Sequence, residues 1–127
     1  MKRATVFVVS GDAAVRDSVK TLVESAGLKA EVFPSLRAFV DAVEPGRRGC
    51  LVFEARADDL GDREGQATLT AACSRMPVLL ITDRGDVRTA VRALKAGATD
   101  IVQKPYKNQN LLNCIKEVLK VGEAARG

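Results

Sequence analysis

The sequence predicts an α/β fold, a three-layer sandwich in which helices cover both faces of a parallel β-sheet. Five short β-branched runs alternate with five helical patterns, and the connections between them are short. Three of the runs are apolar almost throughout, which is typical of strands buried on both faces. The chain has 127 residues, 46% of them hydrophobic, which suits one domain with a proper core.

The five runs are the expected strands, at residues 5–9, 30–33, 50–54, 77–82 and 100–103. Strict alternation of strands and helices favours parallel pairing with right-handed crossovers. For five strands we expect the flavodoxin-like order 2-1-3-4-5. In that order the functional crevice lies outside the carboxyl ends of the first and third strands.

The first three helices follow from apolar stripes and their end signals. Asp12 is a suitable N-cap for the first helix, and Gly27 follows the end of its stripe. A second helix follows Ser35 and stops at Pro45. A weaker third pattern covers about residues 65–74.

The fourth helix begins after Asp86, a good N-cap, and ends at Gly97. One side of it is apolar, and the other carries arginines at fourfold spacing. The apolar side has Val87, Ala90, Val91 and Leu94, and the basic side has Arg84, Arg88 and Arg92. We expect the apolar side to face the core and the arginines to be solvated or to form a docking surface.

The fifth helix carries an apolar stripe that begins at Leu111 and stops near Gly122. The remaining "EAARG" is polar. We therefore expect one domain over residues 1–122, with residues 123–127 as a C-terminal tail or the start of a linker.

Composition excludes several function classes. The chain has no histidine and three widely spaced cysteines, so a zinc site or a histidine-dependent triad is not expected. No apolar run is long enough to span a membrane, and the N-terminus lacks the features of a secretory signal, so we expect a cytoplasmic protein. The net charge of +4 is dispersed and aromatic residues are scarce, so no direct nucleic-acid binding is expected.

Polar residues follow the strands at the predicted crevice. The first strand is followed by Ser10 and Asp12 with Gly11 between them, the third strand ends on a single acid, and the last two strands add a hydroxyl and an ammonium group. The set comprises Ser10, Gly11, Asp12, Glu54, Thr82 and Lys104.

At this point the sequence resembles, over nearly its whole length, the receiver domain of two-component response regulators, a CheY-like fold. Residues 78–106, with "KAGA" and "KP", are similar to receivers of the FixJ and NtrC type, and "AVRDSVKTLVESAGL" is similar to the family's first helix. In that family a carboxylate pair after the first strand binds Mg²⁺, and an aspartate ending the third strand accepts a phosphoryl group. A Thr or Ser then senses the phosphoryl group, and a Lys before a cis-Pro neutralises it.

The chain departs from the family at the residues that carry this chemistry. Ser10 and Gly11 replace the carboxylate pair, and Asp12 comes one position too late and suits a helix cap. Mg²⁺ binding should therefore be weak or absent, and no cofactor is expected. Glu54 is one methylene longer than aspartate, which makes it a poor phosphoacceptor. The same length carries its charge toward Thr82, so it could partly imitate a phosphorylated aspartate.

Other departures agree with this interpretation. The loop after Glu54 keeps only Arg56 of the family's pattern, and Asp83 occupies a place where a small residue is usual and would repel a phosphodonor. Ile101 replaces the family's rotating aromatic residue, and Tyr106 fills a different position. We expect the switch and interaction surface to include Arg84, Arg88, Arg92, Ile101 and Tyr106.

The resulting hypothesis is a degenerate, phosphorylation-independent receiver, a binding module and not an enzyme. The resemblance implies that it acts in signal transduction and transcription regulation. It would use the face of its fourth helix, fifth strand and fifth helix to bind a protein partner or a second copy of itself. A histidine kinase or an output domain are further possible partners, and no membrane is expected.

Several alternatives stay open from the sequence. Glu54 could accept phosphate with Mg²⁺ held by Asp12 and Glu54, or the crevice could bind a small anion or a nucleotide beside Ser10 and Lys104. Glu54 could be only a solvated strand end, or a structural ion-pair partner of Lys104. Whether Glu54 imitates the phosphorylated or the inactive state is also open.

Overall fold

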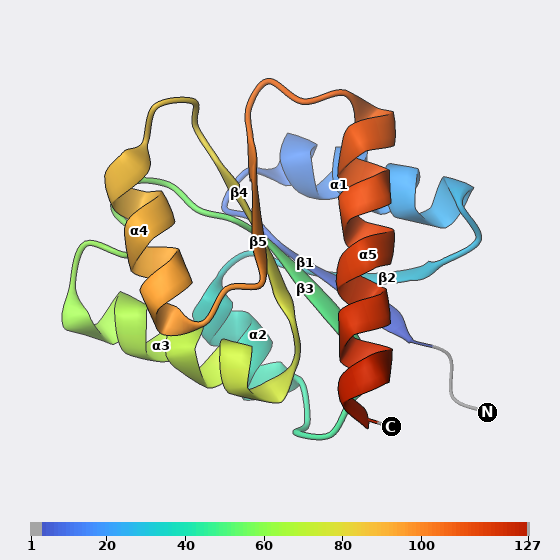
Figure 1. Cartoon of the computed structure of the whole chain (residues 1–127), viewed down its shortest axis with the longest axis horizontal. Coiled ribbons are helices and arrows are strands. Elements are labelled where there is room, and N and C mark those ends of the chain that lie inside the picture. Colours follow the sequence, from blue (N-terminus) through green and yellow to red (C-terminus); the bar gives the residue numbers. More distant parts are fainter. Residues whose placement is uncertain (1–3, 127) are drawn as a thin grey trace.

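The computed structural model describes residues 4–126, with no account of the side chains of residues 125 and 126. Within this range one five-stranded parallel sheet has the order β2-β1-β3-β4-β5, and helices cover both its faces (Figure 1), so the predicted architecture is confirmed. The strands are β1 (Thr5–Val9), β2 (Lys29–Phe33), β3 (Gly49–Glu54), β4 (Val78–Thr82) and β5 (Asp100–Gln103). The helices are α1 (Ala13–Ser25), α2 (Leu36–Ala42), α3 (Arg63–Arg75), α4 (Val87–Ala96) and α5 (Asn108–Arg126).

Side chains that alternate along the central strands feed two separate cores. Phe7, Leu51 and Leu80 point to the face covered by α2, α3 and α4, where three phenylalanine rings meet edge to face. Val8 and Val52 point to the opposite face, which α1 and α5 cover. The strands β1, β3 and β4 are buried except for Gly49, which explains their almost continuous apolar sequences.

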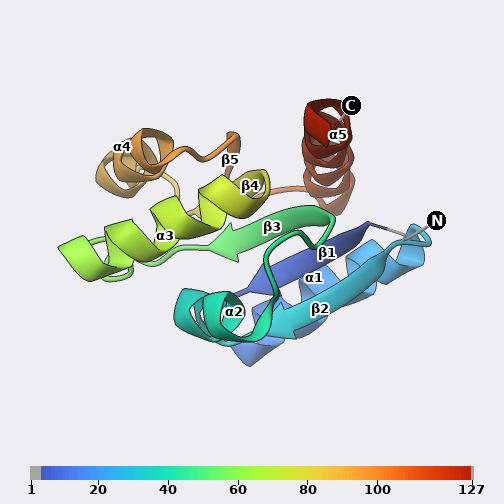
Figure 2. The ribbon, with the colours of Figure 1, turned by 90° about the horizontal axis from the view of Figure 1, so that it is seen from below.

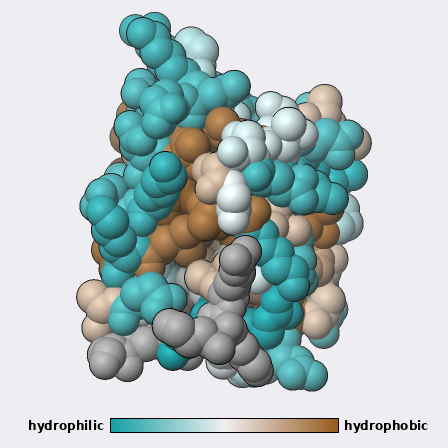
Figure 3. Space-filling model, turned by 90° about the vertical axis from the view of Figure 1, so that its right-hand side faces the viewer, coloured by the Kyte–Doolittle hydropathy of each residue, from teal (hydrophilic) through white to brown (hydrophobic). Residues whose placement is uncertain are grey.

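The layer of α1 and α5 is not fully covered. Figure 3 views the molecule from this side and shows apolar surface between hydrophilic flanks. Partly buried apolar side chains that pack against this core include Leu22, Leu28 and Leu119.

A glycine sets the spacing of β1 and β3 at their amino ends. Gly49 has φ of +146°, and a Cβ built there would lie 1.8 Å from the carbonyl oxygen of Thr5. Only glycine allows the two backbones to come this close. Because this pairing continues in register to Val9 and Phe53, the residues that follow each strand emerge side by side.

The two predicted N-caps, Asp12 and Asp86, are confirmed, and Ser35 is found to cap the second helix. Asp12, Ser35 and Asp86 each accept a hydrogen bond from a backbone N–H in the first turn of α1, α2 and α4. Asp62 caps α3 in the same way, so that helix begins slightly earlier than its weak pattern predicted.

The orientation predicted for α4 is wrong. Val87, Val91 and Leu94 are 64%, 41% and 54% exposed, whereas Thr89 and Ala93 are buried. The small residues face inward because α4 lies close against α3, as Figures 1 and 2 show. At the end of α4, a Cβ built on Gly97 would be only 3.2 Å from Cβ of Cys73 on α3.

Two further expectations need correction. The fifth helix does not stop near Gly122 but continues to Arg126, so the proposed tail at residues 123–127 is helical as far as it is described. Gly122 lies within this helix because α5 packs closely on Pro77 at this point. A Cβ built on Gly122 would lie only 3.1 Å from Cγ of Pro77, so a residue without a side chain fits best. Arg84 is not part of the arginine face of α4, since it lies in the loop before the helix.

Candidate functional site

The crevice residues lie together at the carboxyl edge of the sheet, as predicted. Val9 pairs with Phe53, so Ser10, which follows β1, lies next to Glu54 at the end of β3. On the other side, the backbone N–H of Lys104 donates a 2.8 Å hydrogen bond to the carbonyl of Thr82. Four strands therefore bring these side chains to one place.

Glu54 is the centre of the site, and it is buried. Its side chain is 3% exposed, so the hypothesis of a solvated strand end is wrong. The hydroxyl of Ser10 donates a 2.5 Å hydrogen bond to Oε1, and the ammonium group of Lys104 forms an ion pair with Oε2. A buried carboxylate needs such partners, because an unpaired charge in the interior is strongly unfavourable.

Lys104 is shared between two acids. Besides Glu54, Oδ1 of Asp83 lies 3.5 Å from its Nζ, and the Lys104 side chain is 36% exposed. Partial burial alone would lower the pKa of Lys104, but the hydrogen bonds and charges of Glu54 and Asp83 outweigh it and raise the pKa. The ammonium form of Lys104 is therefore favoured.

The residues at the family's metal-ligand positions have other uses here. Oδ1 of Asp12 accepts a 2.8 Å hydrogen bond from the N–H of Ala14, and Oδ2 lies 3.8 Å from the guanidinium of Arg56. Gly11 has no side chain to offer, and both oxygens of Glu54 are taken. Within residues 4–124, no group of three metal-ligating side chains is close enough to hold an ion. The donor set does not fit Mg²⁺, which is held by free carboxylates and water.

Ser10 is fixed by contacts that the sequence did not predict. The N–H of Asp12 donates to its Oγ at 3.0 Å, and the guanidinium of Arg16 donates to its carbonyl oxygen at 2.7 Å. Arg16 follows the crevice residues in the first helix, but nothing in its spacing indicated this contact. The hydroxyl of Ser10 has two acceptors, Glu54 at 2.5 Å and the carbonyl oxygen of Asp12 at 3.4 Å, and Glu54 is the closer one.

Thr82 is the one crevice residue outside this network. Its side chain is fully buried, and among the described residues its Oγ1 has no hydrogen-bond partner. Buried hydroxyl groups nearly always find a partner, so an isolated one is unusual.

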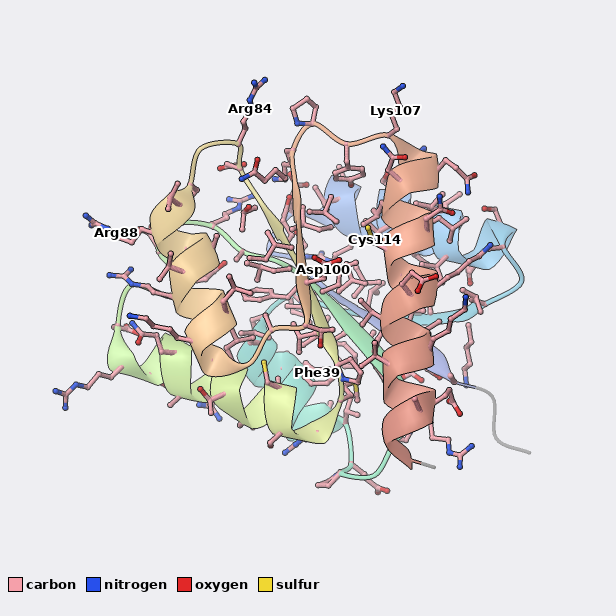
Figure 4. All side chains as sticks on the ribbon, in the orientation of Figure 1. Phe39, Arg84, Arg88, Asp100, Lys107 and Cys114 are labelled. Atoms are coloured by element: carbon pink, nitrogen blue, oxygen red, sulfur yellow. The ribbon has the colours of Figure 1, made fainter. Side chains whose placement is uncertain are left out.

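The predicted interaction surface lies beside the crevice, on the face formed by α4, β5 and α5. Arg84 and Arg88 are exposed and point away from the body of the protein (Figure 4). Arg92, Ile101 and Tyr106 are half-buried. Burial and the negative charge of Glu54 raise the pKa of Tyr106, although Lys104 opposes this, which links Tyr106 electrostatically to the crevice.

The most exposed apolar side chains of this face are ones that the sequence analysis had expected to be buried. We call Val87, Val91 and Leu94 the α4 stripe; they are spaced so that they share one side of the helix. One sequence feature could have indicated this orientation. The other side of the helix carries the small residues Thr89, Ala93 and Ala96, which suit close packing against a neighbouring helix.

The family resemblance is confirmed by comparison with known proteins. The model of the response regulator receiver domain matches residues 6–116. The chain belongs to the response regulator receiver family. The peptide bond between Lys104 and Pro105 is cis, as the resemblance implied.

Two curated relatives illustrate the match. The chain is 36% identical to the transcriptional regulatory protein FixJ of Bradyrhizobium diazoefficiens over 120 residues, which are 94% of this chain and 58% of that protein. It is 31% identical to the response regulator protein TodT of Pseudomonas putida over 125 residues, which are 98% of this chain and 55% of that protein. The chain thus spans little more than half the length of these relatives.

Solved structures give the same result. Response regulator StyR superposes with a TM-score of 0.83 at 37% identity, covering 98% of this chain and 63% of that one. The isolated domain called FixJ-N superposes with a TM-score of 0.81 at 30% identity, covering 94% of this chain and 96% of that one.

In the part of the chain that the structure describes, no helix is both long and apolar enough to cross a lipid bilayer.

Proposed function

We propose that this chain is a degenerate receiver, a pseudo-receiver whose output does not depend on phosphorylation. The observation that carries the proposal is the buried carboxylate of Glu54, with one oxygen bound to Ser10 and the other to Lys104. In the family, this is the place where a phosphoryl group would be received and neutralised. Here a permanent negative charge and its partner lysine already fill it.

Phosphoryl transfer to Glu54 would meet three obstacles. The carboxylate is engaged at both oxygens, and it is 3% exposed, so a donor cannot approach in line without breaking these contacts. It is one methylene longer than aspartate, and a misplacement of about 1 Å can cost roughly a hundredfold in rate. The third obstacle is the lack of carboxylates for the metal ion that neutralises the developing charge.

Weak or absent Mg²⁺ binding is part of the proposal. Asp12 is the acid closest in sequence to the family's ligand positions, and it caps α1 and faces Arg56. To bind a metal ion with Glu54, it would have to give up these contacts, and Glu54 would have to leave Lys104. The rival hypothesis of a Glu54 phosphoacceptor with Mg²⁺ requires both changes.

The output would be a protein–protein contact through the α4–β5–α5 face. The α4 stripe offers exposed apolar side chains beside the basic residues Arg84 and Arg88. Such a mixture of apolar centre and arginine is typical of protein interfaces. The partner would be another protein, such as an output domain or a histidine kinase, or a second copy of this chain.

The names of the relatives supply the process. FixJ is described as a transcriptional regulatory protein, and TodT as a response regulator. By analogy we assign this chain to transcription regulation in the cytoplasm, as a binding module and not an enzyme.

The test is incubation with acetyl phosphate and Mg²⁺, followed by intact mass measurement. The expected result is no phosphoryl adduct at any time point, whereas an authentic FixJ-type receiver treated in parallel is labelled. A stable adduct that maps to Glu54 would support the rival hypothesis and contradict the proposal.

A further inference from the structure

A cavity lies beside the crevice, on the side of the sheet that α2 and α3 cover. Its volume is about 250 Å³, which is small for a ligand pocket. Val9 and Phe53, the last in-register pair of β1 and β3, line it and belong to the core under these helices. Of the crevice residues only Gly11 lines it, so the cavity is separate from the buried carboxylate of Glu54.

The floor of this cavity is apolar. Val9, Leu36 and Phe53 line it, and all three side chains are buried in the surrounding core. Beside them, a Cβ built on Gly11 would meet no atom within 4 Å, so the glycine leaves open space. An apolar group of modest size can therefore enter without displacing a core side chain, and its transfer from water is favourable.

Arg37 lies at one wall of the cavity with hydrogen-bond donors to spare. Its guanidinium donates to the hydroxyl of Thr68, another lining residue, at 3.2 Å. Its two carboxylate neighbours, Asp41 and Glu64, are each 3.8 Å away, which is beyond hydrogen-bond distance. A guanidinium has five N–H donors, so Arg37 can still receive a carboxylate.

Arg56 provides a second guanidinium from the loop after β3. Its N–H donates to Oδ2 of Asp59 at 2.8 Å, which fixes its backbone at the edge of the cavity. Its side chain has one carboxylate nearby, Asp12 at 3.8 Å, and donates no hydrogen bond among the described residues. Two guanidiniums with unused donors thus border one apolar floor.

The acids around the cavity limit the charge of a ligand. Asp59 and Asp62 each accept a 2.8 Å hydrogen bond from a backbone N–H, and the side chain of Glu64 is 81% exposed. Three carboxylates near the site would repel a multiply charged anion such as phosphate or a nucleotide. A single negative charge, in contrast, can be offset by the two guanidiniums.

We infer that this cavity binds a small organic monocarboxylate with a compact apolar body. Its carboxylate would lie between Arg37 and Arg56, since guanidinium groups match carboxylates in geometry. Its apolar body would cover Leu36 and Phe53. A bound ligand would hold the loop after β3, to which Arg56 belongs. The inference goes beyond the proposed function and does not depend on the state of Glu54.

The experiment is an NMR titration of the whole chain with isocaproate, a branched aliphatic acid. The amides of Leu36, Phe53 and Gly65 should shift and saturate, with a Kd of about 1 mM or tighter. The uncharged amide of isocaproate and acetate, which lacks the apolar body, should each bind weaker by roughly fivefold or more. Inorganic phosphate should leave these three amides unchanged.

Variants test the assignment of the two arginines. Arg37→Gln and Arg56→Gln change exposed side chains, so folding should be intact, and each should weaken isocaproate binding by roughly fivefold or more. Arg63→Gln, an exposed arginine on α3 outside the lining, is the matched control and should bind as the wild type.

Three results would overturn the inference: no saturable shifts at the lining residues up to about 20 mM isocaproate, equal binding of its amide, or unchanged binding by both arginine variants. The titration is separate from the labelling test, since Glu54 does not line the cavity. A phosphorylated Glu54 would contradict the proposed function without deciding whether unlabelled protein binds the acid.

Discussion

The two halves of the crevice differ in what they retain of the family's pattern. The half formed by β4 and β5 keeps the hydroxyl of Thr82 and the ammonium group of Lys104. The half formed by β1 and β3 has Ser10, Gly11 and Glu54 where the resemblance implies three aspartate-type acids. Both halves have the same backbone arrangement, since the sheet is parallel and in register across all five strands.

The difference shows that a retained residue can have a different task. Lys104 still reaches the end of β3, but it stabilises a carboxylate that is permanently present. Thr82 still ends the neighbouring strand β4, but its hydroxyl has no hydrogen-bond partner among the described residues. The presence of both residues in a sequence is therefore weak evidence for phosphorylation unless the acids of the other half accompany them.

The largest expected effect comes from restoring the altered half. Ser10→Asp/Gly11→Asp/Glu54→Asp should gain labelling by acetyl phosphate in the presence of Mg²⁺, by roughly a hundredfold or more over the wild type. Intact mass over time measures it, and Glu54→Asp alone serves as the control without metal ligands. Equal labelling of the triple variant and the wild type would mean that the retained half is also inactive.

Removal of the retained lysine should destabilise the protein. Lys104→Met leaves the buried Glu54 without its counter-charge, and we expect a loss of about 2 kcal/mol in the free energy of unfolding, below the full value for a buried pair because Lys104 is 36% exposed. Urea unfolding measures it. Lys107→Met, at a nearby exposed position, is the control and should stay within about 0.5 kcal/mol of the wild type. A loss no larger than that of the control would mean that the ion pair has no structural role.

The same pair predicts an alkaline pH dependence. The pKa of Lys104 is raised in the folded state above its ordinary value of 10.5, so its contribution is fully present below that pH. It is lost as the pH rises through the raised value. The stability difference between the wild type and Lys104→Met should therefore shrink above pH 10.5. Because Lys104 lowers the pKa of Tyr106, the comparison is made with Tyr106→Phe in both proteins. A constant difference would contradict the prediction.

The α4 stripe should matter for binding and little for stability. Leu94→Glu changes an exposed side chain, so the free energy of unfolding should change by about 0.5 kcal/mol or less. Self-association, measured by sedimentation velocity, or the binding of an identified partner should be weakened. Val121→Glu is the control, because Val121 is an apolar residue of similar exposure that lies near Gly49 and Pro77, away from α4. Equal effects of the two variants would argue against a specific surface.

The smallest effect concerns the cysteines. Burial raises the pKa of Cys50 to about 12 and that of Cys73 to about 11, and it also raises the pKa of Cys114. At pH 8 few of these thiols are thiolates, so labelling by a disulfide reagent should be slow in the folded protein and fast in denaturant. Fast labelling of the folded protein would contradict this expectation.

Features set by local sequence were predictable. The strand order follows from the alternation of elements, and the caps at Asp12 and Asp86 follow from residues next to each helix. The meeting of Ser10, Glu54 and Lys104 followed from strand order alone, because carboxyl ends of parallel strands share one edge. The three untested interpretations of this site, in metal binding, phosphorylation and partner choice, remain predictions.

Features set by distant contacts were not predictable. The depth of Glu54 and its bond to Ser10 depend on the register between β1 and β3. The α4 stripe points outward because Thr89 and Ala93 fit closely against α3. The hydrophobic pattern alone cannot show that the side with small residues, and not the more apolar side, packs inward. Gly122 normally indicates a helix end, but close packing on Pro77 explains why a residue without a side chain lies within α5.

The shallow seating of α4 has a consequence for motion. Its buried side chains are Thr89 and Ala93, which are small, while its large apolar groups project into solvent. A helix with so little interior surface needs little free energy to open locally, so its amides should exchange with deuterium sooner than those of α1 and α5. A partner that covered its outer side would slow that exchange, so α4 can report occupancy of this surface even before the partner is identified.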